Sequence, residues 1–217
     1  MVTSTATQLE PIGAPRDEVE SVVVRFAGDS GDGMQLTGSQ FTLATALAGN
    51  DLATFPDFPA EIRAPIGTTF GVSAFQINFG ARKIATAGDA PDVLVAMNPA
   101  ALKVNLGDVK TGGTVIVDSG TFTARNLKKA GFDADPLADD SLDGFQVLQI
   151  DISKLTTEAV KEHGVSNKEA LRSKNMWTLG LIYWLYDRDR DPTVNWLRAK
   201  FGKLPNIAEA NVAALNA

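Results

Sequence analysis

The fold of this chain is decided by one stretch near its N-terminus, Val22-Val23-Val24-Arg25-Phe26-Ala27-Gly28-Asp29-Ser30-Gly31-Asp32-Gly33. Its first half is apolar and rich in β-branched residues, which predicts a strand over 22–27. Three glycines then fall within six positions, and apolar residues recur at helical spacing over about 33–48, which predicts a tight turn and a helix. A helix start presents unpaired N–H groups and the positive end of the helix dipole, and glycine lets another group approach closely. We therefore expect one wall of a functional site at this turn.

Short apolar strands and helices alternate along the rest of the chain. The pattern predicts strands at 51–56, 92–97, 114–118 and 145–150, and helices at 98–106, 124–130, 151–162, 171–186, 192–201 and from 205 onward. Residues 71–79 alternate between apolar and polar, which predicts a half-exposed strand that is antiparallel or at an edge. We expect an α/β domain over 21–217, with three layers and a mixed, mostly parallel sheet that has helices on both faces. A polar, proline-containing stretch predicts a flexible N-terminal arm over 1–20.

The composition excludes several kinds of function. The 217 residues carry a net charge of −6, which argues against binding of nucleic acid. There is no cysteine and only one histidine, so this chain cannot build a disulfide, a thiol nucleophile, a cysteine-ligated metal or cluster, or a multi-histidine site. No catalytic set of residues stands out, and we expect no metal site. No apolar run reaches the length of a membrane span and the N-terminus does not resemble a secretory signal, so we expect a cytoplasmic protein without a membrane partner.

The glycines of the first turn imitate three nucleotide-binding motifs without matching any of them. In a dinucleotide fingerprint that begins at Gly31, the third glycine would fall at Leu36, and no acidic residue stands at position 53. A P-loop would need a Gly-Lys-Ser/Thr sequence, which does not follow. The thiamine diphosphate motif would need an asparagine downstream, and residues 55–65 contain none. Two interpretations stay open, a turn that closes around a ligand and a tight strand–helix turn without one.

Two further stretches are candidates for contacts with a ligand or a partner. Residues 57–69 contain prolines and a glycine, which predicts an irregular loop, and Arg63 stands in it beside Glu61. Arg63 is either a solvated arginine or an anion contact held by a stiff loop, because arginine makes forked contacts to phosphate and carboxylate. Residues 176–186 are apolar on every side, which predicts a helix that lies in the core or is covered by a partner.

The order of these motifs resembles the gamma domain of the 2-oxoacid:ferredoxin oxidoreductases. The similar segments are Gly28–Gly33, Pro59–Ala64, Pro91–Asn98 and Asn175–Gly180, and the resemblance covers about residues 20–200. Arg63-Ala64-Pro65 departs from the Arg-Gly-Gly of pyruvate-type gamma subunits and is more similar to the 2-oxoglutarate type. In that type the gamma domain begins an alpha subunit, so we expect this chain to be a fragment or a truncated subunit.

The resemblance implies a function within a larger enzyme, which oxidatively decarboxylates a 2-oxoacid with coenzyme A (CoA) to acyl-CoA, CO₂ and reduced ferredoxin. It implies that thiamine diphosphate, Mg²⁺ and the iron–sulfur cluster lie in partner domains, that CoA is a co-substrate, and that the isolated chain is inactive. The implied partners are alpha-type and beta-type parts of the same enzyme, and ferredoxin through the complex. We expect this domain to cover the CoA site, with candidate binding residues Gly28, Ser30, Gly31, Asp32, Gly33, Glu61, Arg63 and Thr68. A free-standing transferase that binds CoA or a nucleotide, and a purely structural assembly module, remain as alternatives.

Overall fold

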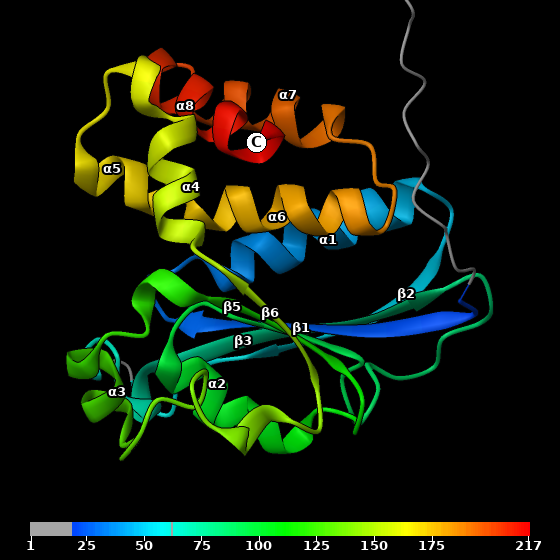
Figure 1. Cartoon of the computed structure of the whole chain (residues 1–217). Helices are drawn as coiled ribbons and strands as arrows, with labels where there is room; N and C mark the ends of the chain where they lie inside the picture. The colour runs from blue at the N-terminus through cyan, green and yellow to red at the C-terminus, as the bar shows by residue number, and fades with distance from the viewer. Residues whose placement is uncertain (1–18, 62) are drawn as a thin grey trace, which may run out of the picture.

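A six-stranded sheet forms the middle of the molecule. The computed structural model describes residues 19–61 and 63–217 (Figure 1). The strands are β1 (Ser21–Asp29), β2 (Asp51–Asp57), β3 (Val72–Gly80), β4 (Val93–Ala96), β5 (Thr114–Asp118) and β6 (Gln146–Ile150), and they lie in the order β2-β3-β1-β4-β5-β6. β1, β4, β5 and β6 are parallel, and β3 runs antiparallel to both of its neighbours. The predicted mixed, mostly parallel sheet is confirmed. Residues 1–18 of the predicted arm lie outside the described residues.

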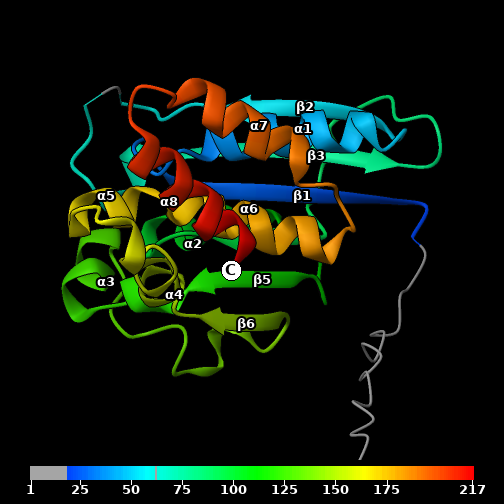
Figure 2. The ribbon, with the colours of Figure 1, turned by 90° about the horizontal axis from the view of Figure 1, so that it is seen from above.

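Helices cover both faces of the sheet, as the sequence predicts. They are α1 (Met34–Leu47), α2 (Pro99–Asn105), α3 (Ala124–Ala130), α4 (Ile152–Ala159), α5 (Asn167–Arg172), α6 (Lys174–Leu185), α7 (Asp191–Lys200) and α8 (Pro205–Asn216). α1 and α6 lie on one face, and α2 lies on the other (Figure 1). α7 and α8 lie outside α1 and α6 and add a layer that the sequence did not predict (Figure 2). No helix in the described ranges is long and apolar enough to cross a bilayer.

Each face of the sheet has its own apolar core. Side chains that are fully buried on the α6 face include Phe26, Phe41 and Tyr183, and those on the α2 face include Leu94 and Leu102. Successive residues of a strand point to opposite faces, so the central strands supply side chains to both cores. This explains why the strand predicted over 22–27 is apolar at nearly every position.

The prediction of a half-exposed strand over 71–79 is wrong in its exposure and right in its direction. β3 is antiparallel, but it lies inside the sheet between β2 and β1, and nearly all of its residues are buried. Gln76 donates from Nε2 to the carbonyl oxygens of Ala87 (2.8 Å) and Gly88 (2.6 Å), and Asn78 donates to that of Thr86 (2.9 Å). The side-chain N–H groups of these two polar residues therefore donate to a covering loop.

The long helix predicted over 171–186 is two helices in the structure. Ser166 and Glu169 form a capping box, which starts α5 at Asn167, before the predicted beginning. The chain then bends at Ser173, which ends α5 and precedes α6. The turn at Ser173 places the first residues of α6 beside the carboxyl ends of the strands.

Candidate functional site at the carboxyl edge of the sheet

A small pocket lies where the direction of the chain changes between two neighbouring strands. β1 leads into α1 on one face of the sheet and β4 leads into α2 on the other, so their carboxyl ends leave a crevice between them. Ligands of open α/β sheets bind at such switch points. The pocket has a volume of about 180 Å³ and is called the edge pocket below. Its lining residues are Asp29, Asp32, Ile66, Gly67, Met97, Asn98, Pro99, Thr121, Asn126, Lys129 and Lys174.

The first turn folds back on itself through Asp32. The backbone N–H of Asp29 donates to Asp32 Oδ2 (2.9 Å), and the N–H of Asp32 donates to the carbonyl oxygen of Asp29 (2.9 Å). Asn98 Nδ2 lies 3.4 Å from the same Asp32 oxygen, while Asn98 Oδ1 accepts from Ala101 N–H and caps α2. Asp32 therefore links the turn after β1 to the turn after β4.

The three glycines of the turn have different roles. A Cβ atom at Gly28 would lie 2.9 Å from Asp32 Oδ2, and one at Gly33 would lie 2.5 Å from Asn175 Nδ2 on α6. Gly33 also has a φ of 76°, which favours glycine. A Cβ atom at Gly31 would meet nothing within 4 Å among the described residues. Two of the glycines are thus explained by packing within the protein, and only Gly31 faces open space.

The two candidate loops are joined by hydrogen bonds. The N–H of Gly67 donates to Asp29 Oδ2 (3.0 Å), and the N–H of Ser30 donates to the carbonyl oxygen of Gly71 (3.1 Å). Lys129 on α3 donates to the carbonyl oxygen of Ile66 (3.2 Å). The first turn and the 57–71 loop therefore form one continuous wall, although they are far apart in the sequence.

The remaining candidate residues lie on the outer part of this wall. Glu61 and Arg63 are exposed and are not among the residues that line the edge pocket. Within the described part of the chain, the Arg63 side chain forms no ion pair. Thr68 donates from Oγ1 to the carbonyl oxygen of Pro65 (2.7 Å), so its hydroxyl holds the loop in shape.

The edge pocket combines buried carboxyl groups with lysines. Burial is the main cause that raises the pKa of Asp29 to about 6, and the nearby Asp32 carboxyl adds to it. Burial also raises the pKa of Asp32, against the effect of the Lys174 ammonium group. Lys174 forms an ion pair of 3.1 Å with Asp118, which is fully buried at the end of β5. The pocket thus holds two carboxyl groups that burial shifts toward the neutral form, next to two cations.

The sequence did not point to the two lysines as site residues. Lys129 is in the last turn of α3 and Lys174 is the first residue of α6. Neither stands in a recognisable motif of its own, and the only sequence signal is that Lys174 directly precedes the Asn175–Gly180 segment. The fold brings both to Asp29 from more than ninety positions away.

This arrangement offers groups that could bind a polar or anionic ligand. The lysines can meet an anion, and Asn98, Thr121 and Asn126 offer amide and hydroxyl groups to a polar ligand. Among the described residues, no three histidine or carboxylate side chains are grouped so that they could hold a metal ion.

Comparisons with known proteins link this fold to one family of enzymes. The family model described as pyruvate ferredoxin/flavodoxin oxidoreductase matches residues 23–217. The chain is 55% identical over 202 residues to the 2-oxoglutarate oxidoreductase subunit KorA of Mycobacterium tuberculosis, a match that covers 93% of this chain and 31% of that subunit. It is 33% identical over 210 residues to the ketoisovalerate oxidoreductase subunit VorA of Methanothermobacter marburgensis, with 96% and 37% covered. The chain spans about a third of the length of these relatives.

Solved structures agree with this match. A 2-oxoglutarate:ferredoxin oxidoreductase from Magnetococcus marinus, solved with 2-oxoglutarate, coenzyme A and succinyl-CoA bound, is 28% identical with a TM-score of 0.68 over 92% of this chain and 30% of that one. The gamma subunit of a keto/oxoacid ferredoxin oxidoreductase from Geobacter sulfurreducens shares the fold at 17% identity, with a TM-score of 0.57 over 89% of this chain and 96% of that one. The chain belongs to the pyruvate ferredoxin/flavodoxin oxidoreductase family.

Proposed function

We propose that this chain is the gamma-type part of a 2-oxoglutarate:ferredoxin oxidoreductase. The observation that carries the proposal is the 55% identity to KorA over 93% of the chain, against 33% to the ketoisovalerate subunit VorA. The assembled enzyme would oxidatively decarboxylate 2-oxoglutarate with CoA to succinyl-CoA, CO₂ and reduced ferredoxin. Neither a free-standing transferase nor a purely structural module has an observation of this kind in its favour.

In this proposal the wall formed by the two joined loops covers the CoA site. CoA carries phosphate groups and, when bound, supplies the thiol that accepts the acyl group. The residues fit an anionic ligand in three respects: Gly31 faces open space, Arg63 is exposed without an ion pair among the described residues, and Lys129 and Lys174 line the edge pocket. The residues that would shape or contact this site are Gly28, Ser30, Gly31, Asp32, Gly33, Glu61, Arg63 and Thr68.

The other cofactors of such an enzyme would be held elsewhere. A chain without cysteine cannot ligate an iron–sulfur cluster through thiolates, so the clusters belong to partner parts. Thiamine diphosphate and Mg²⁺ would lie between alpha-type and beta-type parts, on which this chain assembles. The gamma-type domain over 21–217, the flexible arm over 1–20, the passage of electrons to ferredoxin and the cytoplasmic location belong to the same proposal.

The test replaces Arg63 by alanine in the assembled enzyme. Loss of one charge-assisted hydrogen bond to a phosphate, worth about 1.5 kcal/mol, should raise the KM for CoA about tenfold. The KM for 2-oxoglutarate should stay within about twofold, because an arginine that contacts only CoA adds nothing to binding of the oxoacid. Steady-state kinetics with each substrate varied in turn measure both constants.

Arg82→Ala is the matched control for this test. Arg82 is also an exposed arginine, but it follows the end of β3 at the opposite edge of the sheet and pairs with Glu20. It should leave both KM values unchanged. If the Arg63→Ala enzyme has unchanged KM values for both substrates, Arg63 does not contact CoA. Turnover of CoA by this chain without partners would contradict the proposal as a whole.

A further inference from the structure

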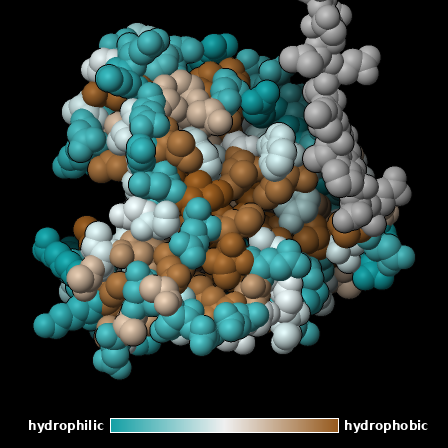
Figure 3. Space-filling model, in the orientation of Figure 1, coloured by the Kyte–Doolittle hydropathy of each residue, from teal (hydrophilic) through white to brown (hydrophobic). Residues whose placement is uncertain are grey.

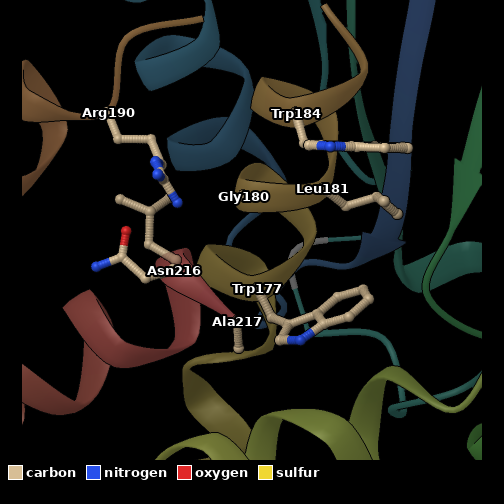
Figure 4. A pocket seen from close by; sticks show the side chains of 8 residues that line it. Trp177, Gly180, Leu181, Trp184, Arg190, Asn216 and Ala217 are labelled. Carbon is tan, nitrogen blue, oxygen red and sulfur yellow. The ribbon is translucent and has the colours of Figure 1, made fainter. Parts of the chain in front are cut away.

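A second hollow lies on the outer side of α6, away from the edge pocket. It has a volume of about 260 Å³ and is lined by Trp177, Gly180, Leu181, Trp184, Arg190, Leu215, Asn216 and Ala217. These residues come from α6, from the start of α7 and from the end of α8 (Figure 4). We call it the α6 groove. Trp184 is 72% exposed, which is unusual for a residue type that normally buries most of its surface.

Apolar surface continues from the α6 groove toward the open edge of the sheet. Figure 3 shows apolar residues gathered in the middle of the side of the molecule that is seen in Figure 1. Leu148 on β6 is 44% exposed, and it points to the same face of the sheet as Ile150, which packs into the core below α6. Contiguous exposed apolar surface of this kind marks an interaction site.

The end of the described chain is fixed in this groove. A Cβ atom at Gly180 would lie only 2.2 Å from the carbonyl oxygen of Leu215. The backbones of α6 and α8 therefore pack directly against each other at this point, because Gly180 has no side chain. Leu215 is buried, while Asn216 and Ala217 are exposed and line the groove. In a subunit that continues past the position of Ala217, the residues that follow would begin inside the α6 groove.

We infer that the α6 groove binds the part of a KorA-type subunit that this chain does not cover, whether that part follows in the same chain or is supplied as a separate one. About two thirds of the KorA relative lies outside the match, and this inference rests on the proposed function. The occupant is a segment with aromatic or leucine side chains that seats against Trp184 and Leu181. A carboxylate in that segment would meet Arg190 at the rim.

The experiment measures binding between the full 217-residue chain and the remaining segment of Mycobacterium tuberculosis KorA by isothermal titration. Trp184→Ser should weaken binding about 30-fold or more, because exposed tryptophans that become buried at an interface dominate its binding energy. Leu148→Ser should weaken it by a smaller factor, about fivefold. Phe55→Ser is the control, since Phe55 is 52% exposed on β2 at the other edge of the sheet and should leave binding unchanged. Because Trp184 is largely exposed, thermal unfolding should show that the variant folds normally.

The outcomes separate this inference from the proposed function. Equal affinities for Trp184→Ser and the wild-type chain would overturn the α6 groove as the docking surface and leave the proposed function standing. The wild-type chain could instead dimerise, and Trp184→Ser could abolish the dimer while KorA binding stays unchanged. That result would assign the groove to a second copy of the chain and would also overturn the inference. If the remaining KorA segment is folded, as its own thermal unfolding would show, absence of binding by the wild-type chain would overturn the inference. The proposed function is tested separately, by the kinetics of the assembled enzyme. If binding depends on Trp184 but the assembled complex does not turn over 2-oxoglutarate, the docking surface would be supported and the proposed substrate would be wrong.

Discussion

Asp29 shows how a single residue at the edge pocket combines a structural role with an electrostatic cost. The residue is 9% exposed, its Oδ2 accepts the N–H of Gly67, and its Oδ1 is buried without a hydrogen-bond partner among the described residues. Its pKa is raised from 3.8 to about 6, mainly by burial. When the pKa of an aspartate is higher in the folded state than in the unfolded state, its protonated form favours folding more than its ionised form does. The stability that this difference contributes is fully present below the unfolded pKa. That contribution is lost as the pH rises from about 4 through about 6.

Replacement of Asp29 by asparagine should therefore stabilise the chain at neutral and alkaline pH. Asparagine keeps an oxygen that can accept the N–H of Gly67 and removes the buried charge. The free energy of unfolding should rise by about 2 to 3 kcal/mol at pH 8, with a much smaller gain near pH 4, as urea unfolding at both pH values would measure. Asp139→Asn is the control, because Asp139 is exposed and Ser141 lowers its pKa, so its replacement should bring no gain. A gain of equal size at both pH values would contradict the assignment to ionisation.

At the scale of the elements, the sequence predicted what local chemistry determines. The helices predicted from 98 and from 151 and the turn predicted before 33 follow from residues within a few positions, and all three are present, with Asn98 capping α2 and Asp151 capping α4. The burial of β3 was not predicted, because the side-chain amide N–H groups of Gln76 and Asn78 donate to a loop that the strand pattern does not reveal. Polar alternation indicates exposure only when no other part of the chain supplies hydrogen bonds.

The candidate site was predicted in part for the same reason. The first turn and the 57–69 loop were found as separate stretches, and the structure joins them through Asp29 and Gly67. The contributions of Lys129 and Lys174 depend on where α3 and α6 pack, which is a property of the topology. Whether Glu61, Arg63 and Thr68 contact CoA stays a prediction.

The crossing of α6 and α8 depends on one residue. Alanine is normally favoured over glycine within a helix by about 1 kcal/mol. At Gly180 its Cβ atom would meet the carbonyl oxygen of Leu215 at 2.2 Å, and a backbone atom cannot move aside as a flexible side chain would. Gly180→Ala should therefore lower the free energy of unfolding by about 1 to 3 kcal/mol in urea denaturation. Gly107→Ala is the control, since a Cβ atom there has no described neighbour within 4 Å. A stabilised Gly180→Ala chain would show that α8 does not pack tightly on α6.

At the scale of the whole molecule, the two cores are coupled through the strands that they share. In β4, Val95 belongs to the core on the α6 face, while Leu94 and Ala96 belong to the core on the α2 face. In β5, Ile116 faces the α6 side and Val115 and Val117 face the other. Neither core can be lost while these strands keep their places, so the described part of the chain should unfold as one cooperative unit.

This coupling can be tested because the tryptophans report on one side only. Trp177, Trp184 and Trp196 lie on α6 and α7, so their fluorescence follows the α6 side, whereas far-ultraviolet circular dichroism follows helices and strands throughout. The two probes should give the same urea midpoint and the same slope, which is the test of a two-state transition. A fluorescence change at clearly lower urea would mean that the layer of α6, α7 and α8 unfolds before the sheet. In that case the shared strands would hold the α2 core together by themselves, and the docking surface on α6 would be the least stable part of the molecule.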